Sequence, residues 1–374
     1  MSKVNWKKVI GWGVGAVFVG CILYFNQPEQ KKDGELLVAA NLPLTGPVSV
    51  IGEPYAKGIE MGVKDELKAQ NLSENSVRLL MGDNQGQAMV AATLFKQQEL
   101  NDYDVYIAGA TDPVYAIMNE VKPDKPLFTL ALDEDITGKR PNNIRILINS
   151  ALSRNKVYEF IKTKNPKKVA IVAGCTSCQK FANTVVIPYL KEHNIDYFVE
   201  SFEFGYKEFR TTALKIKQYN PDIILAKAYP AELLRTITTL KEYGLINNNN
   251  TWTSIDFIDF FDMGEDMKKM NNVIFDATEY NISSNVAFEE EYQERYNKKP
   301  NFWAAYGYDT GRLIVKAWVK SGKVTPETII AQTPYDGVTG HLVMDPKTRD
   351  LISTQILGTL DKDGKVIEWK GKLK

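Results

Sequence analysis

The chain has 374 residues, of which 46 are basic and 46 are acidic, so its formal net charge is zero. Apolar residues make up 44% and charged residues 25%, a composition typical of a globular protein. This length exceeds what one hydrophobic core usually organises, which predicts two domains. A neutral chain lacks the basic excess that nucleic-acid binding requires, so we exclude nucleic acid as a partner.

An uncharged, mostly apolar segment lies near the N-terminus. Twenty residues from Val9 to Pro28 carry no charge, and Lys3, Lys7 and Lys8 precede them. Twenty helical residues span about 30 Å, which matches a bilayer, and the basic leader places the rest of the chain outside the cytoplasm. Three interpretations remain open: a retained anchor over residues 1–28, a lipoprotein signal in which Cys21 is lipidated, and a cleaved signal peptide. We favour the anchor, because no Ala-x-Ala-like cleavage site is present.

Beyond this segment, apolar strands alternate with amphipathic helices in two series. This alternation predicts parallel sheets covered by helices on both faces. In the first series we expect strands at 36–42, 77–81, 105–108 and 127–130, and helices at 55–68, 87–100 and 113–121. In the second we expect strands at 169–173, 197–202 and 223–226, and helices at 153–163, 179–193, 207–219 and 231–243. The two series have the same layout, which predicts two similar lobes.

The last fifth of the chain does not form a third unit of this kind. A strand is expected at 273–277, helices at 286–296 and 303–321, and extended pieces at 340–344 and 352–360. The sequence Asp361-Lys-Asp-Gly364 then predicts a hairpin turn between apolar runs.

Cys175 and Cys178 form a C-x-x-C motif after the expected strand 169–173. Outside the cytoplasm the pair is a disulfide, two free thiols, or a redox pair of the thioredoxin kind. We favour the disulfide, because a thioredoxin-like unit would be much shorter. The two histidines, His193 and His341, are distant in sequence, so the pair lacks further metal ligands. We expect no metal site and no cofactor.

Six short motifs occur in the order in which a known family carries them. They are Pro43-Leu-Thr-Gly46 with Gly52, Gly82-Asp-Asn-Gln85, Tyr106-Ile-Ala-Gly109, Glu208-Phe209, Asn220-Pro-Asp222 and Tyr335-Asp-Gly-Val-Thr-Gly340. With these motifs, residues 35–369 resemble the type I periplasmic binding proteins, especially the branched-chain amino-acid-binding receptors of ABC transporters. The resemblance implies an α/β fold of two doubly wound parallel-sheet lobes, joined by a three-crossing hinge. Within the second motif, we expect Asp83 to fix its own loop.

The resemblance also implies where the lobes divide. Lobe 1 is expected to hold residues 35–150 and 281–334, and lobe 2 residues 151–280 and 335–374. The crossings are expected near 149–153, 278–282 and 333–337. Ligand lies between the lobes, and its binding to both shifts an equilibrium from an open to a closed form.

For lobe 1, the resemblance implies ligand contacts in the loops after the third and fourth strands. Thr111 and the backbone of Ala131 match positions that hold a ligand carboxylate, and Asp112 and Asp133 stand beside them. Two acids repel a carboxylate, which favours an amide, a polyamine-like cation or a ligand with an extra basic group. Ile51 stands where the family often has an aromatic residue. From the residues alone, Thr111 could instead cap a helix, and Asp133 could cap or turn a surface loop.

For lobe 2, the resemblance implies contacts from Cys178 or the nearby Phe181, from Tyr229, and from Asp256, which would receive a ligand ammonium. Cys178 departs from the aromatic residue usual at its position and puts the C-x-x-C at the mouth of the cleft. Tyr229 could instead begin the helix that follows it.

Together these features predict a solute-binding protein on the outer face of the cytoplasmic membrane that delivers a small polar ligand, such as an amino acid or amide, to an ABC permease. The alternative is a membrane-tethered sensor that acts through a partner signalling protein, since no signalling segment precedes Lys374. We do not expect an enzyme, because nucleophile-elbow, zinc-protease and phosphate-loop motifs are missing. Redox work by Cys175 and Cys178 is the one enzymatic idea left.

Overall fold

The computed structural model describes residues 31–371 except 47, 132, 148–149, 204, 229, 255–263, 279 and 281–284. Within these residues, the longest apolar helices fall short of what a membrane crossing needs. The segment 1–28 with Cys21, for which we predicted an anchor, lies outside the described residues. Tyr229 and Asp256 also lie outside them.

Five parallel strands form the first sheet, in the order β2-β1-β3-β4-β5. Their bounds are β1 Leu36–Leu42, β2 Val77–Asp83, β3 Val105–Gly109, β4 Leu127–Leu130 and β5 Asn143–Ile144. Strand β1 is buried at every position, because helices cover both faces of the sheet. The strand order reverses between β1 and β3, so the loops that follow these strands lie at a topological switch point.

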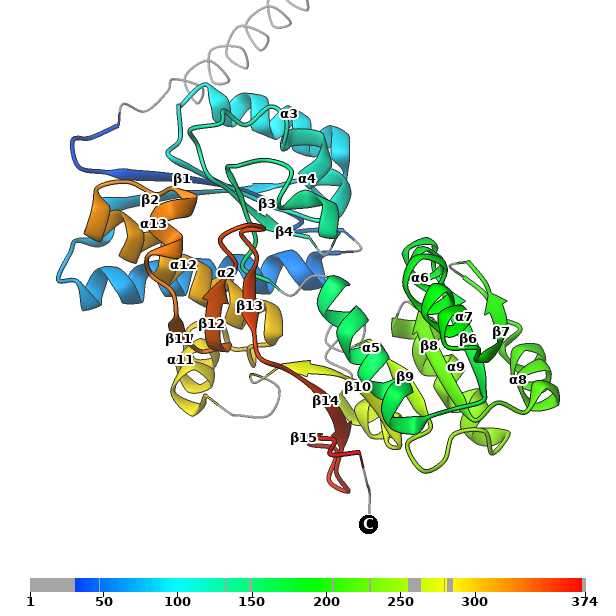
Figure 1. Cartoon of the computed structure of the whole chain (residues 1–374). Coiled ribbons are helices and arrows are strands. Elements are labelled where there is room, and N and C mark those ends of the chain that lie inside the picture. The colour runs from blue at the N-terminus through cyan, green and yellow to red at the C-terminus, as the bar shows by residue number, and fades with distance from the viewer. Residues whose placement is uncertain are drawn as a thin grey trace, which may run out of the picture.

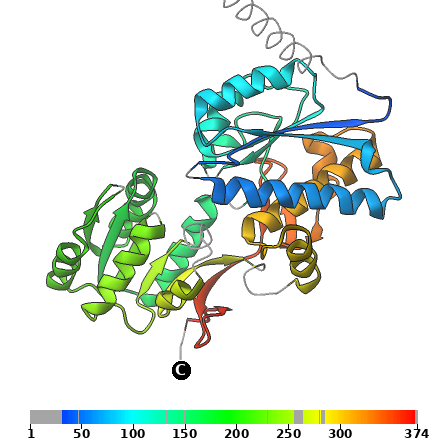
Figure 2. The same ribbon diagram turned by 180° about the vertical axis from the view of Figure 1, so that it is seen from behind.

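Helices cover the two faces of this sheet in separate sets (Figures 1 and 2). Helices α2 (Ser49–Ala69) and α12 (Phe302–Ser321) lie on one face, and α3 (Ala88–Glu99) and α4 (Thr111–Ile117) lie on the other. The alternation along β1 follows from the two-residue period of a strand: Leu37 and Ala39 join the core beneath α3 and α4, while their neighbours join the core beneath α2. Helices α11 (Val286–Tyr296) and α13 (Pro326–Ile330) complete this part of the chain.

Helices α2 and α12 pack with their backbones in contact. Four glycines make this possible: Gly58 and Gly62 on α2, and Gly307 and Gly311 on α12. A Cβ atom on any of them would collide with a carbonyl oxygen of the other helix. The buried hydroxyl of Tyr55 on α2 also lies 3.0 Å from the hydroxyl of Thr310 on α12, so the interface carries a hydrogen bond.

The second sheet repeats this topology and then extends it. Its order is β15-β14-β10-β9-β8-β6-β7. The parallel strands are β6 Lys168–Gly174, β7 Asp196–Ser201, β8 Ile223–Ala228, β9 Thr251–Thr253 and β10 Val273–Thr278. Strands β7-β6-β8-β9-β10 have the same order as the first sheet, so the prediction of two similar series is confirmed. Its switch point lies between β6 and β8.

Around this second sheet lie helices α5 (Ser150–Lys164), α8 (Phe209–Tyr219) and α9 (Pro230–Glu242). Helix α6 (Thr176–Phe181) continues through a π-helical segment, Ala182–Val186, into α7 (Ile187–Glu192). Three short 3₁₀ helices complete the helical elements given bounds in the structure: η1 Glu74–Ser76, η2 Glu134–Ile136 and η5 Gly264–Met270.

The C-terminal part first forms a small antiparallel sheet and then joins the second sheet. Strands β11 (Tyr335–Gly337), β12 (Gly340–Met344) and β13 (Leu351–Ser353) pair with one another. Strand β14 (Gln355–Leu360) pairs antiparallel with β10, and β15 (Val366–Glu368) pairs with β14. By sheet pairing, the last connection to the second sheet runs between β13 and β14, whereas we expected a crossing at 333–337. The lobe boundaries themselves stay a prediction.

Asp309 of α12 fastens the turn between β11 and β12. Its carboxylate accepts the backbone N–H of Val338 at 3.1 Å, and both the N–H and the hydroxyl of Thr339, at 2.9 and 2.5 Å. This contact explains the Tyr335–Gly340 motif, because the turn supplies N–H groups to a buried acid. The predicted hairpin at Asp361–Gly364 is confirmed, since the Asp361 N–H donates to the Lys365 carbonyl at 2.9 Å.

The α/β fold with parallel sheets is therefore confirmed. Strands β5 and β9 were not predicted, because two or three residues are too short to show a period.

Candidate functional site

In open α/β sheets, ligands bind outside the carboxyl ends of the strands at the switch point. In the first sheet this position is formed by the loops after β1 and β3, and in the second by the loops after β6 and β8. These four loops contain several of the predicted ligand contacts.

The loop after β1 is held by Asp83 at the end of β2. One carboxylate oxygen accepts the N–H groups of Leu44, Thr45 and Gln85 at 2.9, 3.1 and 2.9 Å, and the other accepts the Thr45 hydroxyl at 2.5 Å. Burial raises the pKa of Asp83, but the hydrogen bonds from these donors lower it by more than burial raises it. The pKa of Asp83 therefore lies below the usual value. The expectation that Asp83 fixes its own loop is confirmed. The N–H groups of Leu44 and Thr45 are therefore occupied.

Thr111 is the first residue of helix α4, which follows β3. The capping position belongs to Ala110, which has a φ of +72° and makes no side-chain cap. The half-buried Thr111 hydroxyl has no hydrogen-bond partner among the described residues, so the capping alternative is not realised. Asp112, next along the helix, is exposed. Both remain predictions as ligand contacts, and the Thr111 hydroxyl is available for one.

Asp133, in the loop after β4, already has partners for its charge. One carboxylate oxygen caps η2 by accepting the Asp135 N–H at 3.0 Å, so the capping alternative is realised. The other lies 3.5 Å from Nζ of Lys180 on α6, which belongs to the second series. Burial raises the pKa of Asp133, but the Asp135 N–H, Lys180 and the Tyr115 hydroxyl lower it to below its usual range. Burial together with this carboxylate raises the pKa of Tyr115 to about 12.

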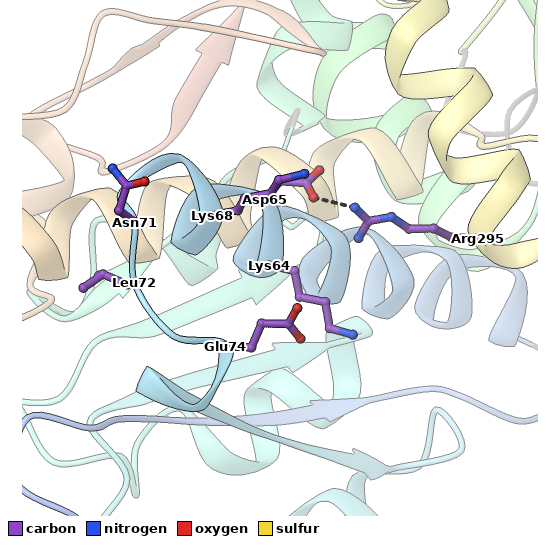
Figure 3. Close-up of a pocket in the computed structure, with 7 residues that line it drawn as sticks. All are labelled: Lys64, Asp65, Lys68, Asn71, Leu72, Glu74 and Arg295. Carbon is purple, nitrogen blue, oxygen red and sulfur yellow. Dashed lines mark hydrogen bonds and ion pairs between the residues drawn. The ribbon is translucent and has the colours of Figure 1, made fainter.

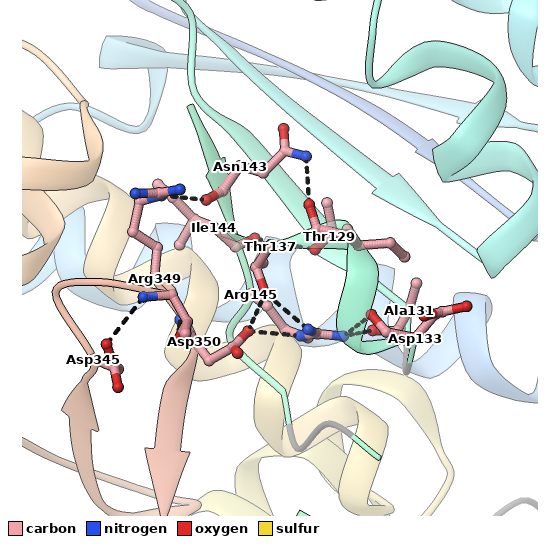
Figure 4. Close-up of polar contacts among 12 residues, drawn as sticks. Thr129, Ala131, Asp133, Thr137, Asn143, Ile144, Arg145, Asp345, Arg349 and Asp350 are labelled. Carbon is pink, nitrogen blue, oxygen red and sulfur yellow. Dashed lines mark hydrogen bonds and ion pairs between the residues drawn. The ribbon is translucent and has the colours of Figure 1, made fainter. Parts of the chain in front are cut away.

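The same loop is held by Arg145, a residue that sequence reasoning missed (Figure 4). Its Nη1 donates to the carbonyl oxygens of Ala131 and Asp133, at 2.8 and 2.7 Å. Arg145 has no exposed surface. The signal was present in the sequence, since a single charge inside the apolar run 144–148 indicates a buried, partnered group.

On the second sheet, a disulfide bond links Cys175 and Cys178. Cys175 occupies the cap of α6, and both residues are 1% exposed. Cys178 lines a cavity of about 10 Å³ with Phe181 and Trp252, room for at most one water molecule. The structure therefore places the Cys178 sulfur in the core of this lobe, whereas we expected it at the mouth of a cleft.

Charged side chains that sequence reasoning did not select lie near the carboxyl ends of β8 and β10. Lys227 on β8 is 8% exposed, with Nζ 4.7 Å from the centre of the Phe181 ring. Asp276 on β10 is 1% exposed and accepts the Trp252 indole N–H at 3.0 Å and the Ser254 hydroxyl at 3.4 Å. Each is a lone charge in an apolar strand, the pattern that Arg145 also shows. Lys227 makes the end of β8 at the second switch point polar although its side chain is buried, and Asp276 does the same for β10, two strands away.

Three predicted contacts remain, of which the structure describes Ile51 alone. Ile51 is half-buried in the first turn of α2 and packs against the main core. Tyr229 and Asp256 follow β8 and β9 in sequence and lie outside the described residues. As ligand contacts, all three stay predictions.

A hollow of about 610 Å³ lies elsewhere on the first lobe (Figure 3). It is lined by Lys64, Asp65, Lys68, Asn71, Leu72, Glu74 and Arg295. These α2 residues come from the helix's C-terminal half, which lies at the amino ends of the strands because α2 runs back along the sheet. The hollow is therefore at the wrong edge for a switch-point ligand.

In the part of the chain that the structure describes, no group of three or more histidine, cysteine or acidic side chains could hold a metal ion. The groups assembled at the strand ends are hydroxyls, carbonyls and partnered charges. Such groups suit reversible binding of a small polar molecule.

Two doubly wound sheets with repeated strand order define a bilobal binding protein of the periplasmic type. The sequence model of the family described as periplasmic binding protein matches residues 35–365, so the chain belongs to this family.

Solved structures with the same fold include binding proteins for different ligands. The leucine-binding protein LivK of Thermotoga maritima is 19% identical, with a TM-score of 0.71 over 89% of this chain and 97% of that one. The branched-chain amino acid transporter protein LivJ of Streptococcus pneumoniae, in complex with isoleucine, has 19% identity and a TM-score of 0.72, again over 89% and 97%. A solute-binding protein of Rhodopseudomonas palustris, in complex with 3,4-dihydroxybenzoic acid, has 19% identity and a TM-score of 0.71 over 90% and 97%.

Proposed function

We propose that this chain is an extracytoplasmic solute-binding protein that captures a small polar ligand between its two lobes and delivers it to an ABC permease. The observation that carries the proposal is the contact between Asp133 and Lys180, at 3.5 Å. It brings the loop after β4 of one sheet against the helix after β6 of the other. One small molecule at this place can touch both lobes and favour the form in which they close.

In the first lobe, the loops after β4 and β1 are each held in place by a charged side chain, which supports binding at this edge of the sheet. Arg145 holds the loop after β4 through two carbonyls, and Asp83 holds the loop after β1. The half-buried Thr111 hydroxyl points to a polar contact, as the family resemblance implies. Preorganised walls of this kind lower the entropy that binding must overcome.

The charges on the described residues widen the ligand class that we propose. The repulsion argument against a carboxylate rested on Asp112 and Asp133. Asp112 is exposed, and Asp133 is already paired with Lys180, so their effect on a ligand carboxylate is reduced. We therefore propose a small polar solute from a class that includes amino acids and aromatic acids, the kinds of ligand in the isoleucine and 3,4-dihydroxybenzoic acid complexes.

The test is thermal unfolding of the full chain with four probes, isoleucine, glutamine, benzoate and putrescine. A ligand present at 100 times its Kd stabilises the native state by about 2.7 kcal/mol, which gives a clear rise in Tm. We expect Thr111→Val to remove most of that rise. Thr93→Val is the matched control, because Thr93 is an exposed threonine on α3. A folded protein whose Tm none of the four probes changes would contradict the proposed ligand class.

Delivery to a permease and attachment through residues 1–28 are the finer parts of the proposal. Membrane fractionation of cells that express the full chain tests attachment. Mass spectrometry of wild type and Cys21→Ser distinguishes a lipid on Cys21 from a retained helix, since only lipidation is lost in the variant. Stimulation of ATP hydrolysis by the reconstituted permease separates transport from sensing through a signalling partner.

A further inference from the structure

Two connections between the lobes are bonded to each other at Arg145. The Arg145 N–H donates to the Arg349 carbonyl at 3.0 Å, and the Arg145 carbonyl accepts the Leu351 N–H at 2.6 Å. The pair Arg145 and Asp350 forms a parallel bridge. From this point one segment continues to α5, which begins at Ser150, and the other continues to β14, which begins at Gln355. Both routes into the second lobe therefore leave the first lobe together.

The side chain of Arg145 ties this point to the loop after β4. Its Nε donates to Asp350 Oδ1 at 2.8 Å, and its Nη2 donates to the Thr137 hydroxyl at 2.8 Å. The Thr137 hydroxyl in turn donates to Asp350 Oδ1 at 2.7 Å. With the two carbonyls held by Nη1, every nitrogen of the guanidinium has a partner (Figure 4).

Such a group needs its partners, because a buried charge without them is costly. The planar guanidinium also presents its donors in fixed directions, which lysine cannot imitate. Arg145 therefore sets the position of the Ala131 and Asp133 carbonyls relative to Asp350 with little freedom.

The loop is linked to the second lobe directly and to the connecting segment indirectly. Asp133 meets Lys180 of α6 directly, and its carbonyl is joined through Arg145 to Asp350, which lies just before β13 on the segment that leads to β14. A rotation of the second lobe about its connections therefore displaces the loop after β4. Conversely, a ligand that displaces this loop shifts the connections and with them the second lobe.

We propose that Arg145 is the positioning residue that couples ligand contact at the loop after β4 to the relative orientation of the two lobes. The proposal rests on the solute-binding function proposed above. Without Arg145 the loop loses its fixed position, so the lobes sample a wider range of orientations and ligand binds less tightly.

The experiment compares Arg145→Lys and Thr137→Val with wild type in the full chain. Thr137→Val removes one hydroxyl from the network and keeps the charge pair, so it serves if Arg145→Lys does not fold. Arg312→Lys is the matched control: Arg312 makes a two-pronged contact with buried Glu66, at 2.8 and 2.7 Å, away from the connections. It tests the same loss of fork geometry at another site.

Two readouts separate coupling from mere loss of stability. The first is the distance between spin labels at Lys96→Cys and Lys217→Cys, exposed positions on α3 and α8, in a Cys21→Ser background without ligand. The second is the Kd for the four probes. We expect Arg145→Lys to widen the label distances and raise the Kd about tenfold or more, with a smaller effect of the same kind in Thr137→Val. Arg312→Lys should lower Tm while leaving distances unchanged and the Kd within about threefold.

Unchanged label distances in both network variants would overturn the proposal, and so would widened distances with an unchanged Kd. If wild type binds none of the probes, the proposed ligand class fails, while the ligand-free label distances still decide whether Arg145 sets the lobe orientation.

Discussion

Replacing Gly311 with alanine tests how closely α2 and α12 approach each other. A Cβ atom at this position would lie 2.6 Å from the Ile59 carbonyl oxygen and 2.9 Å from the Val63 nitrogen. Both atoms belong to the backbone of α2, so neither can rotate away, and the helices must separate instead.

The size of the effect follows from three terms. Overpacking a well-packed core costs about 1–3 kcal/mol, and a rigid backbone contact belongs at the upper end. Separation also weakens the hydrogen bond between Tyr55 and Thr310, worth about 1 kcal/mol. Alanine regains about 1 kcal/mol through its better helix propensity. The net expectation is a loss of about 2–3 kcal/mol in the free energy of unfolding of the first lobe.

Urea unfolding followed by circular dichroism measures this loss. A two-lobe chain need not unfold in one step, so hydrogen exchange of the amides in α2 and α12 assigns the loss to the correct lobe. Lys320→Ala, at an exposed position on the same helix, is the control and should change stability by less than about 0.5 kcal/mol. A Gly311→Ala protein as stable as wild type would refute the reasoning, because it would mean that the two helices can separate freely.

Two further predictions concern buried or partnered acids. The pKa of Asp83 is lowered in the fold, so its contribution is complete above the ordinary pKa near 4 and is lost as pH falls through the lower folded value. Asp83→Asn should cost about 1 kcal/mol at pH 7, from the loss of charge-assisted bonds, with the difference from wild type shrinking below pH 4 in urea titrations; a pH-independent difference would contradict this assignment. Asp309→Ala leaves the donors of Val338 and Thr339 unpaired and should destabilise the protein by about 3 kcal/mol, with faster hydrogen exchange confined to β11 and β12. Uniform exchange across the whole lobe would mean that Asp309 supports more than this turn.

Strands that are predominantly apolar could be predicted from the sequence nearly to the residue. Leu36–Leu42 and Leu127–Leu130 have the expected bounds, because a parallel strand buried on both faces is a nearly continuous apolar run, here with one polar residue in each. The polar network around Arg145 could not be predicted in the same way. Its partner Asp350 is 205 residues away, and no local pattern specifies a contact at that separation.

The candidate site shows the same division between local and distant information. The sequence indicated that a hydroxyl at Thr111 would follow β3, and it left a cap and a ligand contact as equal alternatives. Only the backbone settled the cap, since Ala110 with its positive φ occupies that position. For Asp133 the capping alternative is the one that the structure realises, because η2 begins directly after this residue.

The helical spacing of apolar residues in α6 could have corrected the expectation that Cys178 lies at the mouth of a cleft. Cys178 and Phe181 are three residues apart and share one face of the helix, and both are buried against the sheet. Ser177 and Lys180, also three apart, are exposed on another face. Because Phe181 is a large apolar residue, its face is the one that the sheet must cover, and Cys178 follows it inward. The exposed face of α6 therefore carries a hydroxyl and an ammonium group in place of the disulfide, and this ammonium is the one that lies 3.5 Å from the Asp133 carboxylate.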